Sequence, residues 1–138
     1  MKLHSVLIPV NDIDSAIIFY TQNLFFKKQT DISKIDKKTG LDNRKVSICS
    51  TQSNNNVKII FSTYINSFNP LLIYQKKLHE LGVPYLYLSV SSVDTEYDRL
   101  LNLGIIFSLK PKLIGLEKIA VFEDGCGNHI QIIEHSLI

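Results

Sequence analysis

The sequence predicts an α+β fold in which one β-α-β-β-β module occurs twice, and three observations support this. First, "HSVLIPVNDIDSAIIFY" matches "PYLYLSVSSVDTEYDRL" at an offset of 80 residues. Second, each copy begins with the apolar alternation of a half-buried strand and continues with apolar residues at helical spacing. Third, "KVSICSTQSNNNVKIIF" matches "KIAVFEDGCGNHIQII" at an offset of 73 residues, and both segments are typical of hairpins.

The first copy starts with a strand in "VLIPV". Asp12 is the expected N-cap of the following helix, whose apolar stripe contains Ile13, Ile17 and Tyr20. We then expect a strand in "LFFKKQT", a solvated loop of residues 30–44 that mixes lysines with aspartates, and the first hairpin.

The second copy repeats this order, with a strand in "LYLSV", an N-cap at Ser92 and a helix stop at Gly104. A strand in "IIFSL" and a loop of residues 108–117 precede the second hairpin, whose turn runs from Asp124 to Gly127. Between the copies, Asn69 as N-cap, Pro70 and Gly82 bracket a connecting helix. We therefore predict one domain, residues 1–138, made of a module (1–66), a connecting helix (67–84) and a second module (85–138).

A single module cannot bury the face of its own sheet, so the two modules should pack about an approximate two-fold axis. The predicted result is a curved, mixed eight-stranded sheet around a cavity, with the helices on the outer face. The concave side of such a sheet is the expected ligand site.

Composition excludes several classes of protein. The chain has 138 residues, 45% of them apolar, and a net charge of +2, which argues against nucleic acid or an anionic membrane as a partner. It has neither a membrane-length apolar run nor a signal peptide, so we expect a cytoplasmic protein. Cys49 and Cys126 lack CxxC spacing and are expected to be reduced thiols.

Two motifs resemble a known family. "VLIPVNDIDSAIIFYTQNLFF" resembles the opening "V-x-D-x-x-x-(S/A)-x-x-FY-x-x-x-LGF" of the vicinal oxygen chelate superfamily, which includes glyoxalase I, extradiol dioxygenases and bleomycin-resistance proteins. "EDGCGNHIQIIE" is similar to that superfamily's "DPDGNxIEL". The resemblance covers essentially the whole chain, and Phe25 replaces the glycine of "LGF".

The resemblance also implies where metal-dependent members hold their ion: a histidine on the first strand of each module and a glutamate on the last. The matching positions here are Ser5, Tyr85 and Gln131, with Lys58 or Phe61 as the fourth, since the repeat favours Lys58 and the "TY" after the strand favours Phe61. None of these side chains supplies the imidazole or carboxylate that such a site needs. We therefore expect no metal and no cofactor.

Strand alternation sorts the side chains of the predicted cavity. The expected ligand-binding residues are Ser5, Lys58, Ile60, Phe61, Tyr85, Tyr87, His129 and Gln131. For Tyr85, Tyr87 and Gln131 a structural role is an equally good interpretation, and His129 is more simply a solvated hairpin residue. His4, His79 and His135 show no partner arrangement, and Cys126 with His129 makes a poor nucleophilic pair because glycines flank the cysteine.

The predicted function is metal-independent binding of a small organic molecule, as resemblance to the bleomycin-resistance branch implies. That branch commonly completes its pockets with a second chain, so a homodimer is expected. The alternative is an enzyme of the same superfamily, a lyase, isomerase or dioxygenase, that uses non-standard groups such as Tyr85 or Lys58 as acid or base.

Overall fold

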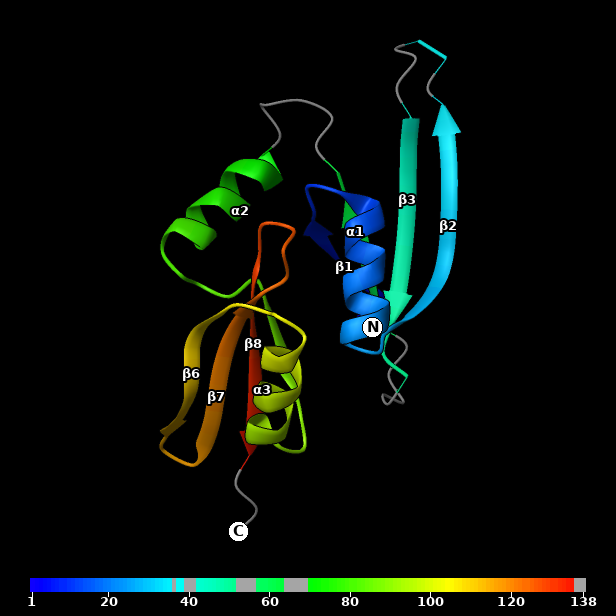
Figure 1. The fold of residues 1–138 in the computed structure, drawn as a ribbon. Helices are drawn as coiled ribbons and strands as arrows, with labels where there is room; N and C mark the ends of the chain where they lie inside the picture. The colour runs from blue at the N-terminus through cyan, green and yellow to red at the C-terminus, as the bar shows by residue number, and fades with distance from the viewer. Residues whose placement is uncertain (36, 39–41, 52–56, 64–69, 136–138) are drawn as a thin grey trace. The chain divides into compact units, whose positions relative to one another are not determined.

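The computed structural model of the protein describes residues 1–35, 37–38, 42–51, 57–63 and 70–135. Its elements follow the predicted order (Figure 1). They are β1 (Ser5–Pro9), α1 (Ile13–Ile18), the π-helical turn η1 (Phe19–Asn23), β2 (Lys27–Ile35), β3 (Asp42–Cys49), β4 (Lys58–Ser62), α2 (Pro70–Glu80), β5 (Leu86–Ser89), α3 (Val93–Asn102), β6 (Phe107–Ile114), β7 (Glu117–Glu123) and β8 (His129–His135). No helix in these ranges is long and apolar enough to cross a membrane.

The chain divides into two compact units, Met1–Leu72 and Ile73–Ile138. Each unit holds a four-stranded mixed sheet, with strand order β1-β4-β3-β2 in the first and β5-β8-β7-β6 in the second. In both, the first and last strands of the module pair in parallel and the remaining pairs are antiparallel. The α+β class and the repeated β-α-β-β-β module are therefore confirmed. Most of α2 belongs to the second unit.

In the first unit, one face of the sheet packs against α1 and η1. Tyr20 is fully buried there, with its ring 5.3 Å from that of Phe61. The predicted N-cap is confirmed, because Asp12 Oδ1 accepts hydrogen bonds from the backbone N–H groups of Asp14 (2.9 Å) and Ser15 (3.3 Å). The apolar residues of α1 and η1 thus cover the face of the sheet that carries Ile8 and Phe61, as the sequence pattern predicts.

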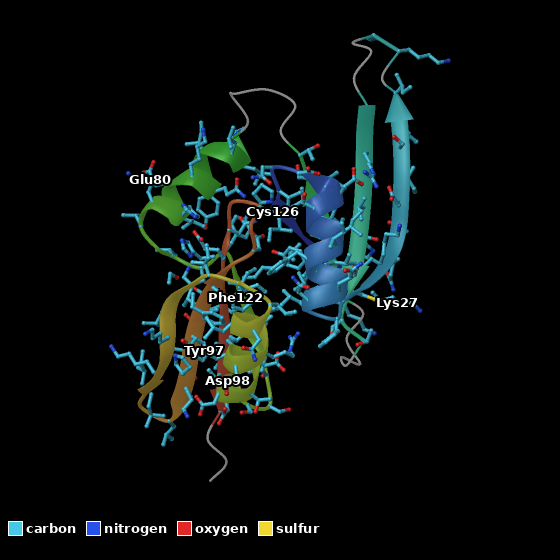
Figure 2. All side chains as sticks on the ribbon, viewed as in Figure 1. Lys27, Glu80, Tyr97, Asp98, Phe122 and Cys126 are labelled. Carbon is cyan, nitrogen blue, oxygen red and sulfur yellow. The ribbon has the colours of Figure 1, made fainter. Side chains whose placement is uncertain are left out.

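In the second unit, α3 covers the equivalent face. Ser92 caps its N-terminus by accepting a hydrogen bond from the Thr95 N–H at 3.2 Å, as predicted. The ring of Tyr97 lies 4.7 Å from that of Phe107 in an edge-on contact, and Figure 2 marks Tyr97 on α3 and the fully buried Phe122 on β7. Gly104, with φ of +83°, ends the helix in a backbone conformation that favours glycine.

Two segments expected to be loops are largely strands. β2 continues to Ile35 and β3 begins at Asp42, so the two form a long ribbon (Figure 1), and β6 likewise continues to Ile114. The charges of the first ribbon pair across strands: Arg44 makes two hydrogen bonds of 2.8 Å to Asp31. Polar composition indicated a loop because a two-stranded ribbon exposed on both faces lacks the apolar alternation of a half-buried strand. The predicted N-cap Asn69 lies outside the described residues, and Pro70 begins α2 as expected.

Candidate functional site

The face of the first sheet that points away from α1 is called here the first open face. Register neighbours in a sheet share a face, and β1 pairs with β4 as Ser5 with Lys58 and Leu7 with Ile60. The predicted site residues Ser5, Lys58 and Ile60 therefore lie together on the first open face, and Leu7 lies there with them. The side chain of Phe61 lies on the other face, where the residue is 1% exposed and packs against Tyr20.

A pocket of about 570 Å³ opens on the first open face. Leu7, Ile32 and Ile60 supply its apolar surface, and Lys34 and Lys45 add positive charge. The complete lining is Leu7, Ile32, Lys34, Arg44, Lys45, Ile60, Phe61, Ser62 and Thr63. This set is called the first-unit pocket, and its volume and mixed lining suit a small organic molecule.

The charges at this pocket divide into paired and available groups. Arg44 is held by Asp31 and, at 2.7 Å, by Asp14, and its hydrogen bonds keep the pKa of the Asp31 carboxyl below its ordinary value. Among the described residues, no carboxylate pairs with Lys34 or Lys45. Within the described ranges, the pocket therefore offers two lysine ammonium groups and no acid that neutralises them.

The second sheet has an equivalent open face. Tyr87 and Gln131 are register neighbours there, with Tyr87 57% exposed and Gln131 half-buried. Tyr85 precedes β5, donates its backbone N–H to the carbonyl of His129 at 2.8 Å and packs its ring edge-on against Tyr74. Burial, with a smaller contribution from Tyr74, raises the pKa of the Tyr85 phenol above its ordinary value.

The strand registers also locate the fourth family position. The backbone N–H of Val10 bonds to the carbonyl of Ser62, and that of Val90 bonds to the carbonyl of Ile133, both at 2.9 Å. Since Val10 and Val90 are repeat equivalents, Ser62 matches Ile133, and two residues earlier Ile60 matches Gln131. The position is therefore Ile60, and both Lys58 and Phe61 are wrong for it. Ile60 also offers no metal-binding group.

The single offset of 73 residues for the hairpins is wrong for a simple reason. The last register pair before the turn is Cys49 with Lys58 in the first hairpin and Glu123 with His129 in the second. The first turn is thus three residues longer, and no single offset can align both strands. The sequence alignment matched apolar residues of one hairpin with apolar residues of the other. In β3 and β7 this match equated residues that lie on different faces of their sheets.

Three polar residues that the sequence did not connect meet in the second unit. His79 Nε2 lies 2.9 Å from Glu123 Oε1, and the His79 ring stacks on that of His129 with centroids 4.5 Å apart. His129 is 6% exposed, so its interpretation as a solvated residue is wrong. The expectation that His79 and His135 have no partner is also wrong, since Glu123 lies beside His79 and Glu117 lies 3.6 Å from His135 Nδ1. The three members come from three different elements, so no sequence motif joins them. The only signal in the sequence was the presence of histidines and a glutamate in these segments.

The expected turn residue Cys126 is a buried free thiol between β7 and β8 (Figure 2). Cys49 is also a free cysteine and half-buried, as expected for reduced thiols. Both glycines that flank Cys126 have positive φ, +72° for Gly125 and +101° for Gly127. This backbone forms a tight turn, consistent with the sequence argument against a catalytic cysteine.

Two β-α-β-β-β units, each with a mixed four-stranded sheet, define a glyoxalase-like α+β protein. The chain belongs to the Glyoxalase/Bleomycin resistance protein/Dioxygenase superfamily, whose model matches residues 2–132. It is 33% identical over 134 residues to the uncharacterized protein YurT of Bacillus subtilis (strain 168), covering 97% of this chain and 99% of YurT.

Solved structures have the same fold. The crystal structure of UcmS2 is similar with a TM-score of 0.77 and 23% identity, covering 97% of this chain and 98% of UcmS2. TnmS3, an antibiotic binding protein from Streptomyces sp. CB03234, is similar with a TM-score of 0.74 and 20% identity, covering 99% of this chain and 97% of TnmS3.

Proposed function

We propose that this protein binds a small organic molecule on its open sheet faces, without a metal ion at the four family positions. The observation that carries the proposal is the set of side chains at those positions: Ser5, Ile60, Tyr85 and Gln131. A divalent ion at such a site needs several imidazoles or carboxylates, and this set contains none.

The first-unit pocket supports a specific ligand chemistry. Leu7, Ile32 and Ile60 suit an apolar or aromatic body, whereas Lys34 and Lys45 suit a negatively charged substituent. A cationic ligand would meet two ammonium groups, and the described lining residues include no carboxylate to compensate them. The proposed ligand class is therefore an amphipathic organic anion.

One further observation supports binding. TnmS3, whose fold this chain shares, is an antibiotic binding protein. Burial raises the pKa of the Tyr85 phenol, which disfavours a role as general base and is compatible with a role as general acid. We also propose that the protein forms a homodimer. Size-exclusion chromatography with light scattering tests this by measuring the molar mass in solution.

A matched pair of fluorescent probes tests the ligand class. 1-Anilinonaphthalene-8-sulfonate carries an apolar aromatic body and an anionic group, and N-phenyl-1-naphthylamine has the same body without the charge. We expect saturable one-to-one binding of the anionic probe that is unchanged by a chelator. Lys45→Ala should weaken it by about 1.4- to 5-fold, since one exposed charge pair contributes ~0.2–1 kcal/mol.

The controls separate this pocket from general surface charge. Lys77→Ala removes an exposed lysine of α2 that lies 3.7 Å from Glu80, and it should leave the affinity for the anionic probe unchanged. The neutral probe should respond to neither substitution. Equal effects of Lys45→Ala and Lys77→Ala, or loss of probe binding on adding the chelator, would contradict the proposal.

A further inference from the structure

The second unit contains a cluster of two imidazoles and one carboxylate that lies apart from the family positions. His79 is on the last turn of α2, Glu123 ends β7 and His129 begins β8. One ligand atom from each of the three residues lies within 4.8 Å of the other two. This set is called the His-Glu-His cluster.

The turn between β7 and β8 fixes two members of the cluster. Asp124 is 1% exposed, and its Oδ1 accepts hydrogen bonds from the backbone N–H groups of Cys126 (2.7 Å) and Asn128 (3.0 Å). Its Oδ2 accepts a third, from the Asn128 side chain at 2.9 Å. This closed turn holds Glu123 and His129 as directly opposed register neighbours, whose side chains share a face.

A buried amide fixes the third member. Gln75 is 3% exposed and donates from Nε2 to the Cys126 carbonyl (3.2 Å) and to Asn128 Oδ1 (2.9 Å). His79 follows Gln75 by four residues, so both side chains lie on the same face of α2. Anchoring Gln75 in the turn therefore places His79 beside Glu123.

We propose that the His-Glu-His cluster binds one divalent transition-metal ion of the zinc class. Two imidazoles and one carboxylate are a donor set suited to Zn²⁺, Ni²⁺ or Cu²⁺ and poorly suited to Mg²⁺ or Ca²⁺. Ser108 Oγ lies 3.3 Å from His129 Nδ1, a contact that orients the ring and leaves Nε2 as its ligand atom. The remaining coordination positions are filled by water.

Binding requires a small local change. Ligand atoms bound tetrahedrally at about 2.0–2.1 Å from Zn²⁺ lie about 3.3 Å apart, slightly more than the 2.9 Å between His79 Nε2 and Glu123 Oε1. The two imidazoles are stacked with an interplanar angle of 22°, so their lone pairs do not converge. The His79 side chain is 43% exposed and can turn out of the stack, whereas buried His129 keeps its place.

The His-Glu-His cluster contains none of the residues of the first-unit pocket and none of the four family positions. It does contain His129, an expected ligand-binding residue that lies on the same face of β8 as Gln131. A metal in the cluster would lie beside the second sheet, held by residues that neither sequence motif of the family marks.

Isothermal titration of the metal-free full chain with ZnCl₂ tests the proposal. We expect about one high-affinity ion per chain and no comparable binding of MgCl₂. His79→Ala should weaken zinc binding at least tenfold, and Glu123→Gln should also weaken it, because each removes one ligand. His79 is exposed, so His79→Ala should fold normally, which circular dichroism checks.

His135→Ala is the matched control. His135 Nδ1 lies 3.6 Å from Glu117 Oε1 and is 65% exposed, so it is another histidine–carboxylate pair of the same unit, without a second imidazole beside it. Its removal should leave zinc affinity unchanged. In imidazole ¹⁵N spectra, zinc should shift His79 and His129 and leave His135 in place. Equal zinc affinity in His79→Ala and the wild type, or unshifted His129 nitrogens, would overturn the proposal.

Discussion

Gly127→Ala tests the contact that joins α2 to the turn between β7 and β8. A Cβ on residue 127 would lie 2.8 Å from Gln75 Nε2, 3.0 Å from its Cδ and 3.2 Å from its Oε1. The contact with Nε2 is too short for a carbon atom and the other two are tight, so the Gln75 amide must move away from its two acceptors. We expect a loss of stability from the displaced amide in addition to the strain of the backbone.

The magnitude follows from two contributions. An alanine at the φ of +101° found at Gly127 costs ~1–3 kcal/mol in backbone strain. A buried amide without its acceptors costs a further ~1–3 kcal/mol. Gly125→Ala is the control, because φ there is +72° and nothing lies within 4 Å of the added Cβ. It should cost only the backbone contribution of ~1–2 kcal/mol.

A double-mutant cycle isolates the contact between residue 127 and Gln75. The free energies of unfolding in urea are measured for the wild type, Gly127→Ala, Gln75→Ala and the double variant. In the Gln75→Ala background the clash is gone, so the cost of Gly127→Ala should fall by ~1–3 kcal/mol. The backbone strain of an alanine at residue 127 is present in both backgrounds and cancels in this cycle. If the two substitutions add to within about 0.5 kcal/mol, the proposed contact between Gln75 and the turn is refuted.

Two further predictions concern the first unit. Because Arg44 lowers the pKa of Asp31, the pair stabilises the fold above the ordinary Asp value of about 3.9, and this stability is lost as pH falls through the lowered pKa. Arg44→Gln should therefore cost ~0.2–1 kcal/mol at pH 7, and its difference from the wild type in urea titrations should shrink on acidification; a constant difference would contradict the reasoning. Phe25 has φ of +63°, so Phe25→Gly should be about 1 kcal/mol more stable than Phe25→Ala in thermal unfolding, and equal stabilities would contradict that strain.

The sequence predicted the elements that depend on local signals. Asp12 and Ser92 cap their helices as expected, because a cap requires only a suitable side chain before an apolar helical stripe. The parity of β4 was also predictable, since burial alternates along a strand with one covered face, and the register places β1 in the same parity. These signals were sufficient for the α+β class and for the repeated module.

Features that depend on several segments were not predictable. The equivalence of Ile60 and Gln131 requires knowledge of the turn lengths, which sequence similarity between two hairpins does not fix. The ribbon of β2 and β3 is held by cross-strand pairs such as Arg44 with Asp31, and an exposed ribbon of this kind has the composition of a loop. The sequence also predicted the ligand-binding role of Tyr85, Tyr87 and Gln131, which stays a prediction.

The first-unit pocket and the His-Glu-His cluster can be tested separately, because they share no residue. His129 and Gln131 lie on the same face of β8, about 7 Å apart along the strand, so the His-Glu-His cluster is displaced by one side-chain position from the family site. Metal found in the purified protein is therefore not by itself evidence for family-type metal chemistry. If the ion is lost in His79→Ala while the affinity for the anionic probe is kept, the ion belongs to the cluster and the pocket binds without it. If the ion persists in His79→Ala, the cluster is not its site, and the zinc proposal is refuted.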